Sequence, residues 1–264
     1  MNIRALILPL LRPQRLFLLA LAIVLVGWSA VTLNWSWIPD YWHNGMILRG
    51  LWTTLWLLGA SWIIGFFCAV WLGLAQAAGP WYLALPAKGF CSLIRGTPLL
   101  LQMWFLYYGL GSLFPSIPWI RHGVLWPYLR EAWPYGLLSL TLSFAGYEGE
   151  VMRGAFKGVA HGQLEAARAY GMPRLTILRR VWLPQAVRNV LPTLGGETVL
   201  QLKATPLVAT ITVLDLYNVS ARVRQETFII YEPLLLLALV YMLITAIIVL
   251  IFRRVERQVP TRMR

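Results

Sequence analysis

Two ionisable residues lie inside an otherwise apolar stretch of the chain. Glu197 and Lys203 fall within residues 189–214, where most other side chains are Val, Leu, Ile or small. Charges inside a membrane are costly and by default indicate a pathway or a ligand site. Six residues of helix place the two side chains about 120° apart, so each needs its own partner. Glu197 either faces a translocation pathway and pairs with an ammonium or cationic group, or is a structural residue hydrogen-bonded to a neighbouring span or subunit.

The same stretch contains residues that disfavour a regular helix. They are Pro192, Gly195, Gly196 and Pro206. Irregular backbone at membrane depth is tolerated only where it is buried in protein or lines a cavity. Glu197 and Lys203 are therefore candidates for a substrate pathway, and the structural alternative for Glu197 stays open. For Glu148 and Glu150, which follow an earlier apolar run, we expect ion pairs with Arg153 or Lys157.

No pattern of catalytic residues appears in the sequence. There is no GxxxxGK[ST] phosphate loop, no HExxH and no GxSxG, and His43, His122 and His161 are scattered. Cys68 and Cys91 have no CxxC partner and are expected to be small packing residues, so we predict neither a disulfide nor a metal site. We therefore expect a pathway protein without catalytic residues and not an enzyme.

The composition excludes an ordinary soluble domain. Of 264 residues, 59% are apolar and 12% charged, against roughly 45–50% and about 25% in soluble proteins. Five stretches are free of charge: residues 16–39, 50–87, 96–120, 132–147 and 233–252. About 20 apolar residues cross a bilayer, so four stretches qualify and 132–147 needs an extra turn. With 189–214 as an imperfect sixth, we predict an all-α, polytopic membrane helix bundle of six spans.

The net charge of +13 sets the orientation of these spans. With both termini on one side, 17 Lys and Arg residues fall on that side and 5 on the other. Cytoplasmic loops carry the excess of Lys and Arg, so both termini are expected in the cytoplasm. The basic surplus then reflects topology and not a nucleic-acid partner. A cleaved signal peptide is the alternative for residues 16–39, although that stretch is long for one.

The longest predicted cytoplasmic loop contains a short helix with a defined end. Residues 163–170 all tolerate helix, Gly171 suits the position just after a helix, and Pro173 prevents continuation. The small residues Ala166 and Ala167 would allow another surface to approach closely. We predict a docking element outside the membrane.

The residues of this loop resemble a known family. Glu165-Ala166-Ala167, three residues, Gly171, nine residues and then Val181-x-Leu183-Pro184 is similar to the signature of permease subunits of binding-protein-dependent ABC importers. Further similarity, to the polar amino-acid branch with its histidine, basic amino-acid and opine members, lies in Arg95-Gly96-Thr97-Pro98, Glu150-Val151-Met152-Arg153-Gly154 and Leu191-Pro192 with Glu197, Lys203 and Leu207. The resemblance covers about residues 46–258.

The resemblance implies an inner-membrane permease that imports a polar amino acid or a derivative such as an opine. Residues 1–45 would be an N-terminal extension with the first span, 46–258 a five-span permease domain, and 259–264 a basic cytoplasmic tail. The coupling site would comprise Glu165, Ala166, Ala167, Gly171, Leu183 and Pro184.

The resemblance also implies the partners. They are two ATP-binding subunits that hold ATP and Mg²⁺, a second permease chain, identical or homologous, and a periplasmic substrate-binding protein; no cofactor is expected on this chain. Relatives often have an acidic residue after the position of Lys203, where this chain has Ala204, which weakens the case for strongly cationic substrates. The alternative, a stand-alone ion-coupled transporter or channel, does not explain the spacing from Glu165 to Pro184.

Overall fold

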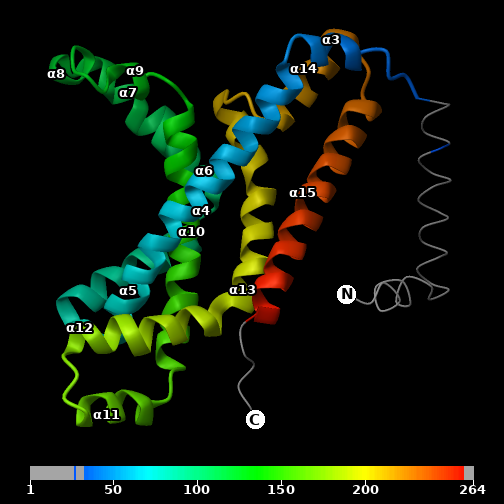
Figure 1. The fold of residues 1–264 in the computed structure, drawn as a ribbon. Coiled ribbons are helices and arrows are strands. Elements are labelled where there is room, and N and C mark those ends of the chain that lie inside the picture. Colours follow the sequence, from blue (N-terminus) through cyan, green and yellow to red (C-terminus); the bar gives the residue numbers. More distant parts are fainter. Residues whose placement is uncertain (1–26, 28–32, 259–264) are drawn as a thin grey trace.

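The computed structural model describes residues 27 and 33–258 and consists of helices joined by short turns (Figure 1). The predicted first span falls mostly outside these residues, and the basic tail 259–264 wholly so. The α-helices are α3 (Ile38–His43), α4 (Met46–Ala78), α5 (Trp81–Gly96), α6 (Leu99–Trp104), α7 (Gly111–Leu113), α8 (Pro118–Arg121), α9 (Trp126–Leu129), α10 (Trp133–Lys157), α11 (His161–Ala169), α12 (Arg174–Ile177), α13 (Leu183–Ala204), α14 (Leu216–Thr227) and α15 (Tyr231–Gln258). The all-α prediction is confirmed for this part of the chain.

Helices α4 and α10 form the most extensive helix contact in the fold. Glycine makes their close approach possible. A Cβ atom added to Gly73 of α4 would lie 2.6 Å from the Cβ of Met152 on α10, which is closer than real side chains pack. Small residues at such contacts let helix backbones approach in membrane proteins. Helices α5 and α13 pack against this pair, and α15 packs against α13 and α14.

The charge-free run 50–87 is two helices and not one span. Helix α4 ends at Ala78, Gly79 and Pro80 are extended, and α5 then begins at Trp81. Proline cannot donate a helical hydrogen bond, and it disfavours helix in the residue before it, which explains the break. A second break at Thr97 and Pro98 separates α5 from α6.

The remaining apolar runs form helices with shifted limits. Run 96–120 becomes the helical turns of residues 99–116, and run 233–252 lies within α15. Run 132–147 is the first part of α10, which continues to Lys157 and so exceeds the predicted span.

The predicted interruption of 189–214 is only partly correct. Helix α13 passes through Pro192, Gly195 and Gly196 without a break, whereas Pro206 lies in a 3-10 segment, Thr205–Ile211. Gly195 serves packing instead, because a Cβ there would lie 3.2 Å from Phe252 of α15.

Two of the described helices, α4 and α15, are long and apolar enough to cross a membrane on their own. The stretch 174–211 together with α14 passes the same test as a third span bent by 50°. Only 6% of the apolar window of α15 is buried, so its side chains face outward as they would toward lipid. Six spans stay a prediction.

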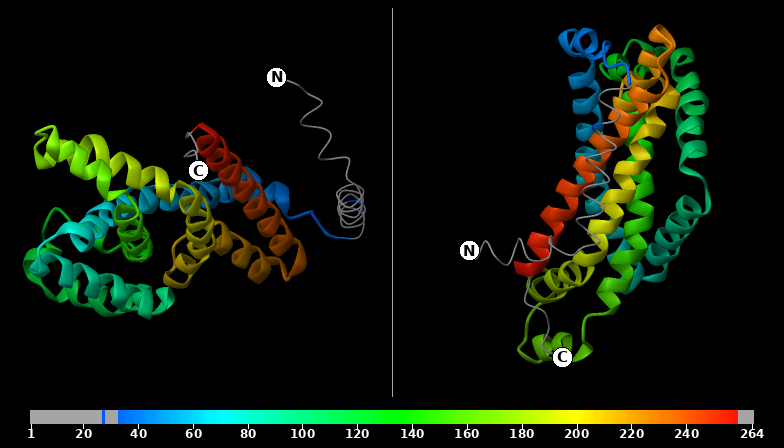
Figure 2. Two further views of the ribbon diagram at one scale, coloured as in Figure 1. Left: turned by 90° about the horizontal axis from the view of Figure 1, so that it is seen from below. Right: turned by 90° about the vertical axis from the view of Figure 1, so that its right-hand side faces the viewer.

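Two ends of the molecule can be distinguished. Helices α11 and α12 and the end of α15 lie at one end, with α3 and α14 at the other (Figures 1 and 2).

At the α14 end, the Tyr41 hydroxyl donates a hydrogen bond to Glu226. Burial and this carboxylate raise the pKa of Tyr41 to about 12, so the hydroxyl keeps its proton at neutral pH.

Candidate functional site

The predicted docking helix is present as α11 and ends where expected. Gly171 has a φ of +73°, in the left-handed region that favours glycine. Its N–H donates to the Arg168 carbonyl at 2.8 Å, and the N–H of Met172 donates to the Ala167 carbonyl at 3.2 Å. These two bonds form a Schellman motif, which satisfies the last carbonyls of the helix. The predicted role of Gly171 as a helix terminator is confirmed.

The two faces of α11 differ in exposure. Leu164 and Ala167 are buried in the cluster formed with α10 and α13, whereas Glu165 and Ala166 are exposed. Of the two alanines predicted to admit a partner, only Ala166 is available at the surface. Ala167 fixes the helix to its own chain.

Leu183 and Pro184, which end the motif, belong to α13 and not to α11, the helix that contains Glu165. Both residues are half-buried in the first turn of α13. A π-helical segment, Leu178–Trp182, precedes them, and Pro184 cannot donate a backbone hydrogen bond at this point. Trp182 Nε1 donates to the Phe156 carbonyl at 2.9 Å. This segment therefore joins the docking loop to α10.

A second region of interest is a polar groove between α10 and α13. It has a volume of about 290 Å³ and is lined by Ser143, Phe144, Tyr147, Glu197, Leu200, Gln201 and Ala204. Glu197 is half-buried and faces this groove. Lys203 is exposed and does not line it. The structure thus separates the two ionisable residues that the sequence placed in one segment.

Buried hydrogen bonds hold α13 in the orientation that points Glu197 toward the groove. Gln201 Nε2 donates to Ser61 Oγ of α4 and to the Leu140 carbonyl of α10, both at 3.0 Å. Trp62 Nε1 of α4 donates to Thr198 Oγ1 at 2.8 Å. In a low-dielectric interior such bonds also fix helix rotation.

Glu148 and Glu150 differ from each other in a way the sequence reading missed. Glu150 pairs with Arg153 at 2.8 Å, as predicted, and lies 3.9 Å from Arg95. Glu148 is fully buried, and neither of its carboxylate oxygens has a hydrogen-bond partner within the described residues. The predicted ion pair of Glu148 is wrong, because Arg153 and Lys157 lie on other faces of α10. The charged side chain that acts on it electrostatically is another carboxylate, Glu197.

Arg95 of α5 lies near the same carboxylates. Its guanidinium carbon is 5.8 Å from the centre of the Tyr147 ring, and its charge acts on Glu197. Because Glu150 already has Arg153, the carboxylates of Glu148 and Glu197 outnumber the cations left to balance them. Among the described residues, neither Glu148 nor Glu197 forms an ion pair.

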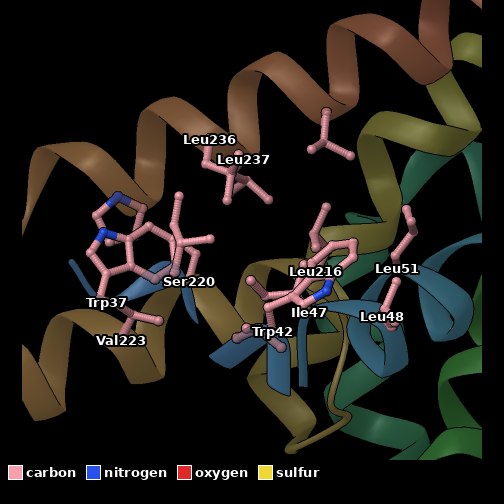
Figure 3. A pocket seen from close by; sticks show the side chains of 14 residues that line it. Trp37, Trp42, Ile47, Leu48, Leu51, Leu216, Ser220, Val223, Leu236 and Leu237 are labelled. Carbon is pink, nitrogen blue, oxygen red and sulfur yellow. The ribbon is translucent and has the colours of Figure 1, made fainter. Parts of the chain in front are cut away.

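The pocket in Figure 3 has the opposite character. It lies between α3, α4, α14 and α15, has a volume of about 230 Å³, and is lined almost wholly by apolar side chains, among them Trp37, Leu216 and Leu237. It contains no charged side chain and does not fit a polar ligand.

Of the two cysteines, Cys91 is buried as predicted, but Cys68 is exposed on α4 and does not pack in the core of this chain.

Comparison with known proteins identifies the chain. Residues 61–260 match the family of binding-protein-dependent transport system inner membrane components. The chain belongs to this family. An octopine transport system permease protein from Rhizobium meliloti is 38% identical over 210 residues, which cover 80% of this chain and 84% of that one. A histidine/lysine/arginine/ornithine transport system permease protein from Escherichia coli K12 is 33% identical over 224 residues, covering 84% and 92%.

A solved structure described as an amino acid ABC transporter with histidines is also similar to this permease. The TM-score is 0.71 and the identity 28%, with 86% of this chain and all of that chain covered. The chain is thus the permease subunit of an ABC importer and an inner-membrane protein, as the loop residues predicted. Membership in this family does not favour the alternative of a stand-alone ion-coupled transporter.

Proposed function

We propose that this permease carries a polar amino acid or an amino-acid derivative such as an opine into the cell. The names of its relatives support this substrate class: octopine and nopaline permeases and a permease for histidine, lysine, arginine and ornithine are 33–38% identical to it. The observation that carries the proposal furthest is Glu197, a half-buried side chain that lines the groove between α10 and α13 and forms no ion pair among the described residues. Such a site fits an ammonium or guanidinium group.

In this proposal Glu197 contacts the substrate, and Glu148 is a second, fully buried carboxyl group whose protonation is coupled electrostatically to Glu197. Every zwitterionic amino acid has an α-ammonium group, so the site need not require a cationic side chain. Lys203 points elsewhere, and we propose for it a pathway role in which it meets the substrate carboxylate at another stage. An alternating-access cycle would expose these residues in turn.

The coupling site is proposed at α11. Glu165 and Ala166 form its exposed face and would fit a groove of an ATP-binding subunit, while Ala167 and Gly171 hold the helix in place. Leu183 and Pro184 would transmit the movement to α13. ATP and Mg²⁺ would bind to the partner subunits, and this chain would hold no cofactor and carry out no catalysis.

The assembly would contain two ATP-binding subunits, a second permease chain, identical or homologous, and a periplasmic binding protein. We propose that both termini lie in the cytoplasm. The end with α11 and the end of α15 contains most of the basic residues of the described chain, which supports this orientation.

Reconstitution tests the proposal. The permease, the co-purified ATPase and the binding protein are placed in vesicles, and uptake of labelled arginine, histidine and octopine is measured with and without ATP. We expect ATP-dependent uptake of at least one of them and a loss of roughly tenfold or more in Glu197→Gln. Uptake by the permease alone would overturn the ABC-importer assignment. Normal uptake by a correctly assembled Glu197→Gln variant would overturn the pathway role.

A further inference from the structure

A large groove lies at the α11 end of the molecule, apart from the polar groove at Glu197. Its volume is about 900 Å³, and it is bounded by the end of α4, the start of α5, α11 and α12. Its lining combines apolar side chains, such as Trp71 and Leu83, with the two basic residues Arg168 and Arg174. An apolar wall combined with two cations is the pattern of an amphiphile site.

The apolar wall is continuous with the outer surface of the spans. Trp71 is 69% exposed and Leu83 is 52% exposed, although both are large apolar residues. Phe67, one turn before Trp71 on α4, is also exposed. In a membrane helix such a surface fits lipid tails, which would give an acyl chain access to the groove.

The two arginines form no ion pair in the described part of the chain. Among the described residues, no carboxylate lies within ion-pair distance of Arg168 or Arg174. Arg168 follows Leu164 by four residues, and both line the groove. Glu165 lies three residues before Arg168, so the groove borders the proposed ATPase-binding surface of α11.

We propose that this groove binds an anionic phospholipid of the cytoplasmic leaflet. The guanidinium groups of Arg168 and Arg174 would bind the headgroup phosphate by charge-assisted hydrogen bonds, and the acyl chains would lie along Leu83 and Trp71. Inorganic phosphate could bind the arginines but would make no contact with the apolar wall. The proposal rests on the proposed function only in placing α11 in the cytoplasm.

The position gives the lipid a role in coupling. Leu164 and Arg168 line the groove, and the neighbouring Glu165 and Ala166 form the proposed ATPase-binding surface of the same helix. A lipid bound in the groove would restrain α11 next to the surface that contacts the ATP-binding subunit. We expect transport to depend on the content of anionic lipid.

Lipid binding can be measured directly on the full chain. The purified permease is placed in phosphatidylcholine nanodiscs with a trace of phosphatidylglycerol that has a photoreactive acyl chain, and the captured lipid is mapped by mass spectrometry. We expect labelled peptides from the end of α4 and the start of α5. In the double variant Arg168→Ala/Arg174→Ala, capture should fall by roughly tenfold or more.

The matched control removes two other arginines from the same side. Arg179 and Arg180 are exposed in the next turns of the chain and do not line the groove. Arg179→Ala/Arg180→Ala should capture lipid as the unmodified chain does. Equal losses in the two double variants would show a general charge effect and overturn the site.

Activity of the assembled importer supplies the second readout. ATP-driven uptake is compared in vesicles of phosphatidylcholine alone and with added phosphatidylglycerol. The unmodified complex should be stimulated severalfold, and the Arg168→Ala/Arg174→Ala complex should not. If this variant captures lipid normally but no longer retains the ATP-binding subunit, the groove is a protein contact and the proposal fails. Because capture is measured without substrate, it does not depend on which substrate is carried.

Discussion

Glu148 and Glu150 lie two residues apart on α10 and have opposite environments. Glu150 forms an ion pair of 2.8 Å with Arg153, whereas Glu148 is fully buried with no partner among the described residues. A carboxylate buried without compensation costs several kcal/mol of folding free energy, on the order of magnitude known for unpaired buried charges. A fold retains such a group where a ligand or a proton can compensate it.

The first prediction concerns Glu148→Gln. The amide has the same shape and is cheaper to bury, so the midpoint of thermal unfolding should stay the same or rise. Uptake of an amino acid by the reconstituted importer should fall roughly tenfold or more, which corresponds to about 1.4 kcal/mol of lost interaction per factor of ten. Unchanged uptake together with raised stability would assign Glu148 no part in the pathway.

Glu150→Gln is the matched control for this variant. It removes a carboxylate two residues away that is already balanced by Arg153 and Arg95. Because Arg153 is partly exposed, solvent screens the pair, and we expect a stability loss of about 1 kcal/mol or less. The unfolding midpoint should therefore fall in Glu150→Gln and not in Glu148→Gln.

The contrast at α10 shows what the sequence could predict. The helical character of the apolar runs and the helix-ending Gly171 are predicted correctly, because side-chain hydrophobicity and backbone sterics act locally, whereas the limits of the helices are not. The Glu148 error was avoidable in part: five residues of helix turn Arg153 about 140° away from Glu148, whereas Glu150 and Arg153 are three apart and share a face. The partial burial of Glu197 depends on how α10 and α13 pack, and no local pattern encodes that.

The break at Gly79 and Pro80 was also visible in the sequence. A count of charge-free residues passes over it, whereas a Gly-Pro pair is one of the stronger signals for ending a helix. In contrast, Pro192 does not interrupt α13. Tertiary packing, including the contact of Gly195 with Phe252, decides between these outcomes.

The second prediction concerns the end of α11. Gly171→Ala places a Cβ in a left-handed conformation at a cost of about 1–2 kcal/mol, which should loosen the Schellman motif. We expect substrate-stimulated ATP hydrolysis by the complex to fall severalfold. Gly162→Ala is the control, because Gly162 lies in the same helix with no atom within 4 Å of an added Cβ. It should retain full stimulation, and equal losses in both variants would argue against a special role of Gly171.

The third prediction tests the contact between α4 and α10. Gly73→Ala forces a methyl group against Met152 and the backbone of Arg153. Overpacking of this kind costs typically about 1–3 kcal/mol. The unfolding midpoint of the purified permease should drop by several degrees. Gly59→Ala on the same helix meets no atom within 4 Å and should leave the midpoint unchanged or raise it. An unchanged unfolding midpoint in Gly73→Ala would mean that α4 and α10 can move apart at this point without loss of stability.

The fourth prediction concerns the link between the docking loop and α10. Trp182 Nε1 donates to the Phe156 carbonyl at 2.9 Å, and the two rings meet edge to face with centroids 5.3 Å apart. Trp182→Phe keeps an aromatic ring but removes the donor, at a cost of about 0.5–1.5 kcal/mol. If this bond helps to carry motion from α11 to the spans, uptake per ATP hydrolysed should fall while ATPase binding is retained. Trp81→Phe, at a residue that is 78% exposed at the start of α5, should leave that ratio unchanged. A normal ratio in Trp182→Phe would place the mechanical link elsewhere, at the contact of Leu164 and Ala167 with the core.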